Sequence, residues 1–337
     1  MKKIFLGIIV TGFSLLLLTG CNKTEEKKLD YLVLVNKYSQ LPDDWEEKVE
    51  LVDTKNAWDE DIKIEKETYD NYLKLKKDLE KDGVTIELDS VYRSVKAQQN
   101  LWDSWTVEKG IDYVRKYVAV PGYSEHHTGL AVDICLRKDG ELEYENDDMI
   151  ADRETFAKVH AKLADYGFIL RYLENRDDIT GYAYEPWHLR YVGSSEIAKE
   201  IKDKNLTFEE YLGQIEDIKD NKAAAKYRIE KTLQDYFKET YGDKISNSRF
   251  NITKIYSSEE EKELSSLKEM NLGKKDIAFE VTYQLQPSND KVILELTEND
   301  GEYNKDFGWV TNISRVGILK YNDKTNSYTI DKFENNF

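Results

Sequence analysis

The spacing of apolar residues predicts helices and strands in alternation over the first two thirds of the chain. A helical spacing of apolar side chains predicts helices at 65–81, 95–109, 152–166 and 194–203. Alternating or continuous apolar runs predict strands at 84–92, 129–135, 168–172 and 188–192. We therefore expect an α+β domain over residues 35–205, with a small, mostly antiparallel sheet and flanking helices.

The segments on either side of this domain have different patterns. Residues 31–65 are a lead-in with mixed signals, in which "VLVN" at 32–35 favours a strand. Beyond residue 206 the pattern predicts one helix at 222–240 and then strands at 249–256, 276–285, 291–297, 309–320 and 326–333. This order predicts a second α+β domain over 206–337, which contains no histidine, no cysteine and no chemical motif.

The first twenty residues predict export. Lys2 and Lys3 precede an apolar run from Ile4 to Leu18, as in a secretory signal peptide. The run ends in "LTGC", which resembles a bacterial lipobox and would make Cys21 the lipidated residue. An ordinary signal peptide or an uncleaved anchor is the alternative. We expect residues 1–20 to be removed, residues 21–34 to form a polar tether, and the protein to be lipid-anchored on the outer face of a bacterial cytoplasmic membrane.

Charge and cysteine content narrow the possible partners. The net charge of −17 argues against nucleic acid as a partner and against electrostatic adhesion to anionic lipid. The chain has two cysteines, so lipidation of Cys21 leaves Cys135 without a disulfide partner. Stability must then come from apolar cores, for which 337 residues with 40% hydrophobic content are sufficient. The oligomeric state is not indicated.

Three of the four histidines lie in two short motifs that suit a metal site. His126 stands seven residues before Asp133, and Glu185 stands three residues before His188. Pro186 excludes a helix interior there, so an extended entry into a strand would direct Glu185 and His188 to one place. Taken singly, Asp133 could cap a turn, Glu185 could be a surface charge and His188 could be a core residue. Their joint occurrence favours a metal site, in which Glu185 fits a general base acting on water.

His160 has a different place, because it lies on the apolar face of its predicted helix. We therefore expect it to be a hydrogen-bonded core residue and not a metal ligand.

These motifs resemble a known enzyme group. The stretch from Ser124 to Asp133 is similar to the S-x-H-x-x-G-x-A-x-D signature of LAS-group zinc metallopeptidases, and "EPWH" at 185–188 is similar to their E-x-x-H. The closest resemblance, over about residues 65–195, is to VanY-like and LdcB-like D-alanyl-D-alanine carboxypeptidases. It implies one Zn²⁺ per chain, held by His126, Asp133 and His188, with Glu185 as catalytic base. Cobalt or nickel could occupy the same ligands. The neighbouring His127 falls on a non-ligand position.

The resemblance also implies substrate-side residues. "SVYRSVKAQQ" at 90–99 is similar to a Y-R-S-x-x-x-Q segment of the family. Arg93 would then stabilise the oxyanion, while the implied substrate-binding residues are Tyr92, Gln98, Ser124 and Tyr172. Two departures are visible: Val91 replaces a glycine found in many relatives, and the residue after Tyr172 is not the usual proline.

The function implied is zinc-dependent removal of C-terminal D-alanine from peptidoglycan stem peptides. Three alternatives remain open: an endopeptidase with the same site, a stem-peptide-binding module without turnover, and a scaffold for a functional C-terminal domain. The presence of both Glu185 and Arg93 favours catalysis. The sequence does not separate D,D-cleavage from L,D-cleavage.

Overall fold

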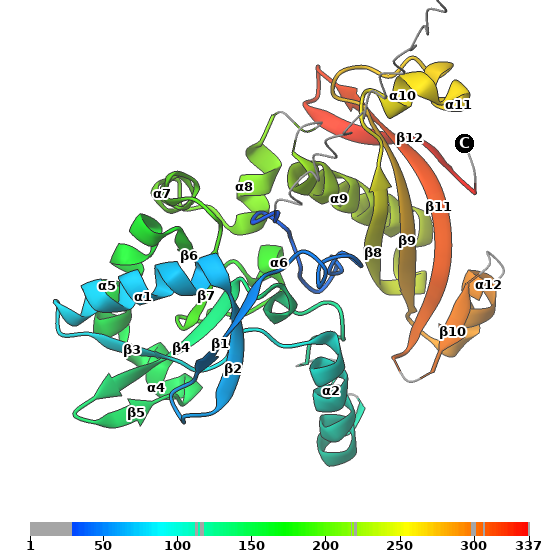
Figure 1. The fold of residues 1–337 in the computed structure, drawn as a ribbon. Helices are drawn as coiled ribbons and strands as arrows, with labels where there is room; N and C mark the ends of the chain where they lie inside the picture. Colours follow the sequence, from blue (N-terminus) through cyan, green and yellow to red (C-terminus); the bar gives the residue numbers. More distant parts are fainter. Residues whose placement is uncertain are drawn as a thin grey trace, which may run out of the picture.

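The structure, a computed structural model, describes residues 29–335 except 112–113, 115–117, 217, 219–220, 298–300 and 306. It contains two α+β units that lie beside each other (Figure 1). The predicted signal peptide, Cys21 and most of the predicted tether lie outside the described residues. None of the helices in the described part of the chain combines the length and apolar character needed to cross a membrane.

The first unit is built on a small antiparallel sheet, as the sequence predicted. Its strand order is β3 (Thr85–Leu88), β4 (Ala131–Lys138), β7 (His188–Tyr191) and β6 (Phe168–Leu170), and β5 (Glu141–Glu143) also pairs with β4. In the register of β4 with β7, Asp133 lies directly opposite His188. The sheet therefore brings together two residues that are 55 positions apart in the sequence.

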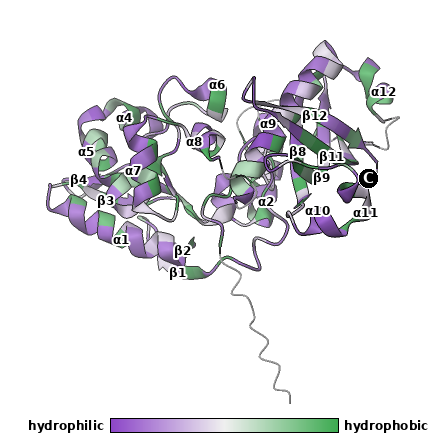
Figure 2. Ribbon diagram, turned by 90° about the horizontal axis from the view of Figure 1, so that it is seen from above, coloured by the Kyte–Doolittle hydropathy of each residue, from purple (hydrophilic) through white to green (hydrophobic). Residues whose placement is uncertain are grey.

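Helices flank this sheet. They are α1 (Lys66–Glu80), α2 (Val95–Lys109), α4 (Asn146–Ala151), α5 (Arg153–Leu163), α6 (Asp177–Thr180) and α7 (Ser195–Asp203). Helices α1, α2, α5 and α7 lie where the apolar periodicity predicted them, whereas the short α4 and α6 were not predicted. Ser94 and Ser194 cap α2 and α7, because each hydroxyl accepts a hydrogen bond from a backbone N–H of the first turn. Buried side chains of α1 and α5 pack in the same core as those of β3 and β4. Hydrophilic residues line the exposed side of α1 (Figure 2).

The lead-in differs from the sequence prediction. Residues 32–35 form no strand, although 33–35 are buried. Their side chains enter two different cores, and the carbonyls of Val33 and Leu34 accept hydrogen bonds from the side chains of Arg190 and Lys226 instead of from a strand. The last residues of the predicted tether thus belong to the folded unit. The hairpin of β1 (Leu51–Lys55) and β2 (Asp61–Glu65) was not predicted, since it is half exposed and rich in charged residues.

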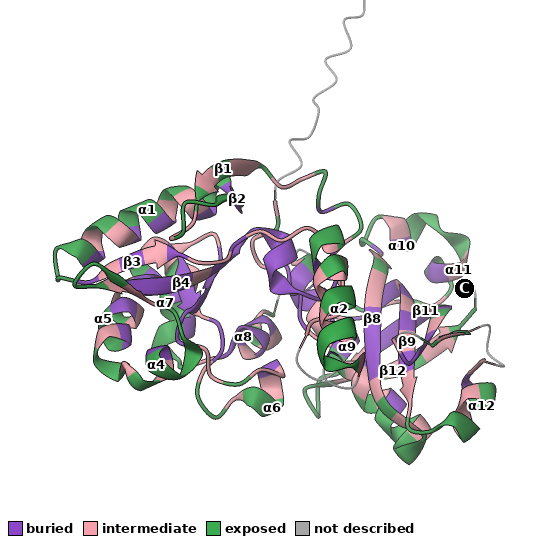
Figure 3. Ribbon diagram, turned by 90° about the horizontal axis from the view of Figure 1, so that it is seen from below, coloured by how far each residue is buried: buried purple, intermediate pink, exposed green. Residues whose placement is uncertain are grey.

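The second unit is one long helix packed on an antiparallel sheet. Helix α9 (Lys222–Tyr241) covers the sheet of β10 (Glu302–Asn304), β11 (Trp309–Asn322), β9 (Ile277–Pro287), β8 (Ile245–Ile255) and β12 (Ser327–Glu334) (Figure 1). Phe237 of α9 contacts Phe250 and Tyr283 of the sheet. Buried residues are most frequent on β9 and β11, whereas most residues of β8 are partly exposed (Figure 3). Short helical segments lie at the edges: η3 (Gly242–Lys244), α10 (Glu260–Glu263), α11 (Ser265–Lys268), η4 (Asp290–Val292) and α12 (Ile293–Thr297).

The strand predicted at 291–297 is wrong. The segment is η4 followed by α12, because the side chain of Asn289 accepts a hydrogen bond from Lys291 N and starts a helical turn. Only one side of that turn is buried: Leu296 is 1% exposed, whereas Leu294 is 72% exposed.

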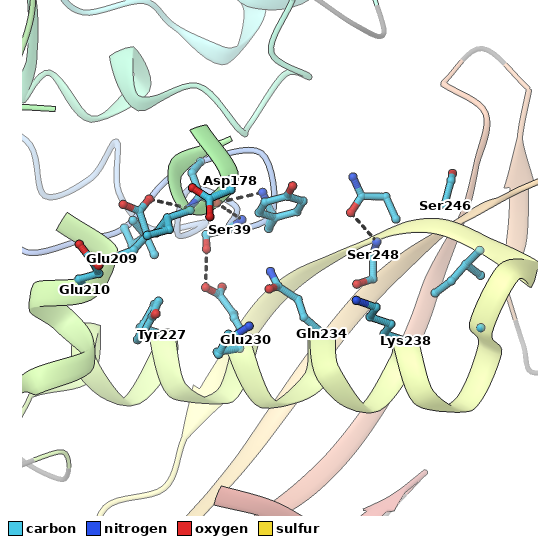
Figure 4. Close-up of a pocket in the computed structure, with 18 of the residues that line it drawn as sticks. Ser39, Asp178, Glu209, Glu210, Tyr227, Glu230, Gln234, Lys238, Ser246 and Ser248 are labelled. Atoms are coloured by element: carbon cyan, nitrogen blue, oxygen red, sulfur yellow. Dashed lines mark hydrogen bonds between the residues drawn. The ribbon is translucent and has the colours of Figure 1, made fainter. Parts of the chain in front are cut away.

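The two units share an interface formed by α8 (Phe208–Gln214), α9 and the segment 34–41. Ser39 forms a parallel bridge with Phe250 of β8, and Lys226 of α9 donates a 2.8 Å hydrogen bond to the carbonyl of Gln40. A cavity of about 790 Å³ lies along this interface. In it the hydroxyl of Ser39 donates to Glu230 (Figure 4). The segment 34–41 thus joins the second unit to the first.

Candidate metal centre

Three side chains from separate elements meet at one point of the first unit. Asp133 comes from β4, His188 opens β7, and His126 lies in the short helical turn η1 (Glu125–Thr128). Each offers a ligand atom, and these atoms lie within 4.8 Å of one another. His126 Nε2 is 3.1 Å from Asp133 Oδ2, and His188 Nδ1 is 2.9 Å from Asp133 Oδ1. The structure therefore brings together the three predicted ligands.

A glycine ends the turn that carries His126. Gly129 has φ +73°, and a Cβ atom there would lie 3.2 Å from the backbone nitrogen of Glu65. Both the left-handed backbone and the close approach favour glycine. This position lets the chain leave η1 and enter β4 immediately, so His126 and Asp133 face the same site.

In each imidazole, one ring nitrogen donates a hydrogen bond away from the site, and the other ring nitrogen faces Asp133 with its lone pair. His126 Nδ1 donates to the carbonyl of Val91 at 2.7 Å, and His188 Nε2 donates to Glu125 Oε2 at 3.0 Å. The other ring nitrogens of the neutral imidazoles are then acceptors. Asp133 Oδ1 is buried and has no hydrogen-bond donor among the described residues. Two nitrogen lone pairs and a carboxylate that face one another fit a divalent cation with a preference for nitrogen and oxygen ligands.

The charges in the site also favour a cation. Burial raises the pKa of Asp133, but His126 and His188 outweigh it and hold that pKa well below the usual range. Burial lowers the pKa of His188, but Asp133 and Glu125 raise it more strongly, to about 10. The site therefore takes up positive charge, either as a proton or as a metal ion.

Glu185 lies beside this triad. Its Oε2 is 3.7 Å from His188 Nδ1, and burial raises its pKa to about 7. Pro186 follows it in the turn before β7, and the carbonyl of Pro186 accepts a 2.9 Å hydrogen bond from His160 Nε2. His160 is thus hydrogen-bonded and lies apart from the three clustered ligand residues, as expected, but it is only partly buried and does not belong to the core. Its hydrogen bond holds the turn that carries Glu185. A carboxyl with a pKa near neutrality can both accept and return a proton.

A buried charged network holds the ring of His188 on the side away from Asp133, and no sequence pattern predicted this network. Glu125 accepts hydrogen bonds from Arg171 Nε at 2.9 Å and from Arg190 Nη1 at 2.7 Å, in addition to His188. Arg171 also forms a two-bond ion pair with Glu209 of α8. All four charged residues are at most 3% exposed. The available signal was an arginine within each of the apolar strand runs "FILRY" and "HLRYV".

Comparison with known proteins agrees with this site. A family model described as VanY, D-alanyl-D-alanine carboxypeptidase, matches residues 61–194. YodJ of Bacillus subtilis (strain 168), a proposed carboxypeptidase, is 37% identical over 200 residues, which cover 58% of this chain and 72% of that protein. The chain belongs to the VanY family of D-alanyl-D-alanine carboxypeptidases.

Two further VanY-type relatives differ in how much of the chain they cover. The bifunctional D-Ala-D-Ala dipeptidase and carboxypeptidase VanXYC of Enterococcus gallinarum is 42% identical over 137 residues, 40% of this chain and 67% of its own. The solved structure of the LdcB LD-carboxypeptidase is 37% identical, has a TM-score of 0.48, and covers 55% of this chain and 87% of its own. The VanY match spans residues 61–194, so the segment 34–41 precedes it and the second unit follows it.

The backbone of Arg93 is hydrogen-bonded to that of His126, one of the three clustered ligand residues. Its amide donates to the carbonyl of His126 at 3.1 Å. Its guanidinium donates to Gln98 Oε1 and to Ser90 Oγ, each at 3.1 Å. Gln98 in turn donates to the carbonyl of Ala119 at 2.8 Å. Both ends of the Gln98 amide are therefore engaged within the chain, and in this structure Gln98 positions Arg93.

The other predicted substrate residues have varied surroundings in this VanY unit. The ring of Tyr172 packs on His188 with 4.7 Å between centroids, whereas the hydroxyl of Tyr92 donates to Glu46 at 3.2 Å. Ser124 is buried immediately before η1. His127 accepts from the amide of Gly122 and donates from Nδ1 to the carbonyl of Arg93, at 2.6 Å. His127 is thus a structural link between two loops.

Proposed function

We propose that this chain is a zinc-dependent carboxypeptidase that removes C-terminal D-alanine from peptidoglycan stem peptides. The observation that carries the proposal is the convergence of His126, Asp133 and His188 within 4.8 Å, with Glu185 beside them. One such triad supports one zinc ion per chain. The relatives named for D-Ala-D-Ala carboxypeptidase activity support the substrate class.

The chemistry is divided between the ion and the protein. A bound zinc ion would supply Lewis acidity towards a water molecule and the scissile carbonyl. Glu185 would accept the proton of the attacking water and return it to the leaving amine, a role for which its pKa of about 7 is suited. Arg93, which Gln98 and Ser90 hold in place, would stabilise the negative charge that develops on the carbonyl oxygen.

The test is D-alanine release from synthetic stem tetrapeptide and pentapeptide, followed by mass spectrometry, with and without a chelator. A Glu185→Gln variant serves as the matched control because it keeps the shape of the side chain. We expect chelator-sensitive loss of one alanine with the native protein and a loss of activity of at least ~100-fold with the variant. The preferred peptide distinguishes D,D-cleavage from L,D-cleavage.

Release from neither peptide would refute the carboxypeptidase. Cleavage of cross-linked muropeptides would then identify an endopeptidase, and stoichiometric peptide binding without turnover would identify a binding module.

The cellular location is a separate proposal. Export of the chain and lipidation of Cys21 would place the site outside the cytoplasmic membrane, where stem peptides occur. Mass spectrometry of the protein purified from the membrane fraction of a bacterial host tests this. Acyl chains on an N-terminal Cys21 are expected, and an unmodified cysteine in a soluble protein would contradict the proposal.

A further inference from the structure

A small cavity at the junction of the two units contains positive charge without a matching carboxylate. It has a volume of about 210 Å³ and draws its lining from the segment 34–41, α2 and the second unit. The residues that matter for its chemistry are Lys37, Tyr38, Trp102, Arg249 and Trp309. Figure 1 shows the dark-blue N-terminal segment running between the first unit and β8, where this cavity lies. Apart from Trp102, these residues lie outside the segment 61–194 that matches the VanY family.

Arg249 of β8 is the central group of the cavity. It is 9% exposed, and its Nε donates to the carbonyl of Lys37 at 2.9 Å. Its guanidinium stacks on Trp309 at 3.9 Å from the ring centroid, and it lies 4.9 Å from that of Tyr123. Its Nη1 is buried without a hydrogen-bond acceptor, and no carboxylate of the described residues forms an ion pair with it.

Two other buried arginines in the described part of the chain show what this guanidinium lacks. Arg171 and Arg190 are fully buried, and both are ion-paired with Glu125. A buried cation without a counter-charge is costly, because desolvation is not offset by an ionic contact. Arg249 is held in place by aromatic rings and one backbone carbonyl, and it lines a cavity in which an anion could supply the missing counter-charge.

Lys37 links this cavity to the catalytic centre. Its Nζ lies 4.6 Å from the ring centroid of Tyr182, and no carboxylate in the described ranges lies within ion-pair distance of it. Tyr182 packs on Tyr172, which packs on His188, with centroid distances of 4.7 Å at both steps. A continuous path of aromatic and basic side chains therefore runs from the metal centre to Arg249.

We propose that Arg249 and Lys37 form a subsite for a carboxylate of the peptide substrate. The inference rests on the proposed function, because it takes the substrate to be a stem peptide. Lys37 and Arg249 line the same cavity, and the rings of Tyr182 and Tyr172 lie between Lys37 and His188. The carboxyl carbon of the leaving D-alanine is within about 4 Å of the scissile carbonyl carbon. The subsite is therefore assigned to a carboxylate upstream of the scissile bond, such as the α-carboxylate of the γ-linked glutamyl residue. The second unit thereby contributes to substrate selection.

The test is calorimetric binding to metal-free, full-length protein, which needs no turnover. Three product peptides are compared: L-Ala-γ-D-Glu-L-Lys-D-Ala, its isoglutamine counterpart, and its C-terminal carboxamide. We expect the isoglutamine peptide to bind about tenfold or more weakly than the free acid, as for the loss of one charge-assisted hydrogen bond. Arg249→Gln and Lys37→Gln should reduce binding of the acid to the level of the isoglutamine peptide and leave binding of the latter unchanged.

The controls separate a binding role from a structural one. Lys254→Gln removes another cation of β8 that lies over a tyrosine ring, outside the cavity, and should bind all three peptides as the native protein does. Lys37 is only partly buried, so its variant remains informative if Arg249→Gln does not fold.

Three outcomes would overturn the subsite: equal affinity of native protein for acid and isoglutamine peptides, equal weakening of both in the variants, or sensitivity to the C-terminal carboxamide alone. Failure of the proposed function is seen separately, as absence of D-alanine release by the native protein with zinc.

Discussion

Glu125 offers the sharpest test of how the fold prepares the metal centre. Its carboxylate accepts hydrogen bonds from His188, Arg171 and Arg190, and it is 3% exposed. Burial raises the pKa of Glu125, but the two guanidinium groups and His188 hold it well below its usual range. Glu125→Gln keeps the shape and removes the charge. The change leaves Arg190 without a carboxylate partner and Arg171 with Glu209 alone, and it weakens the acceptor that fixes the imidazole of His188.

Two consequences follow, and their magnitudes can be separated. Breaking a buried ion pair costs about 3–5 kcal/mol of stability, out of the ~5–15 kcal/mol typical of a folded domain. Loss of a hydrogen bond behind a ligating histidine reduces metal affinity about 10–100-fold. The Glu125→Gln protein should therefore still fold at low temperature, yet bind zinc measurably more weakly.

The assay is urea unfolding together with zinc titration against a chromophoric chelator, at a temperature well below the unfolding midpoint. Glu154→Gln is the matched control: Glu154 is paired with Lys158 but is 86% exposed, so its loss should cost at most ~1 kcal/mol and leave zinc affinity unchanged. Native zinc affinity in Glu125→Gln would refute the reasoning that this carboxylate orients His188. A stability loss no larger than that of the control would refute the cost assigned to the buried network.

Three further predictions concern metal, pH and backbone. Chelation should lower the melting temperature and added zinc should restore it, because a ligand at 1,000 times its Kd stabilises the folded protein by about 4 kcal/mol. A melting temperature that responds to neither chelator nor zinc would contradict the metal site. Burial raises the folded-state pKa of Glu230 to about 7. The folded protein therefore holds the carboxyl proton of Glu230 more tightly than the unfolded chain does. The free energy of unfolding should fall by roughly 3 kcal/mol as pH rises from ~4.5 to ~7. In urea unfolding across this range, Glu230→Gln should remove that part of the decline, and parallel pH profiles of variant and native protein would disprove it. Gly193→Ala should destabilise the protein by about 1–3 kcal/mol more than Gly83→Ala in urea unfolding. Both glycines have positive φ, but only a Cβ at Gly193 would meet another residue, Tyr31 at 2.7 Å. Equal losses of stability in the two variants would show that the contact with Tyr31 relaxes without cost.

Local sequence patterns were enough to predict most helices and to single out the residues that the fold brings together as the triad. Helical periodicity and capping serines depend on neighbouring residues, so α1, α2, α5, α7 and α9 follow from the pattern. Histidine is so scarce in this chain that two short motifs were enough to select His126, Asp133, Glu185 and His188. Where the pattern was short or half exposed it failed: the β1–β2 hairpin was missed, and 293–297 is a helix.

The surroundings of those residues depend on contacts that form only in the folded protein. The antiparallel register sets Asp133 opposite His188, and the pairing of β6 with β7 brings Arg171 and Arg190 to either side of the buried Glu125. Such contacts join residues far apart in the chain, and no local pattern encodes which buried charge meets which. The same reason applies to Arg249, whose exposed-looking strand position becomes a buried, unpaired cation only because the second unit docks on the segment 34–41.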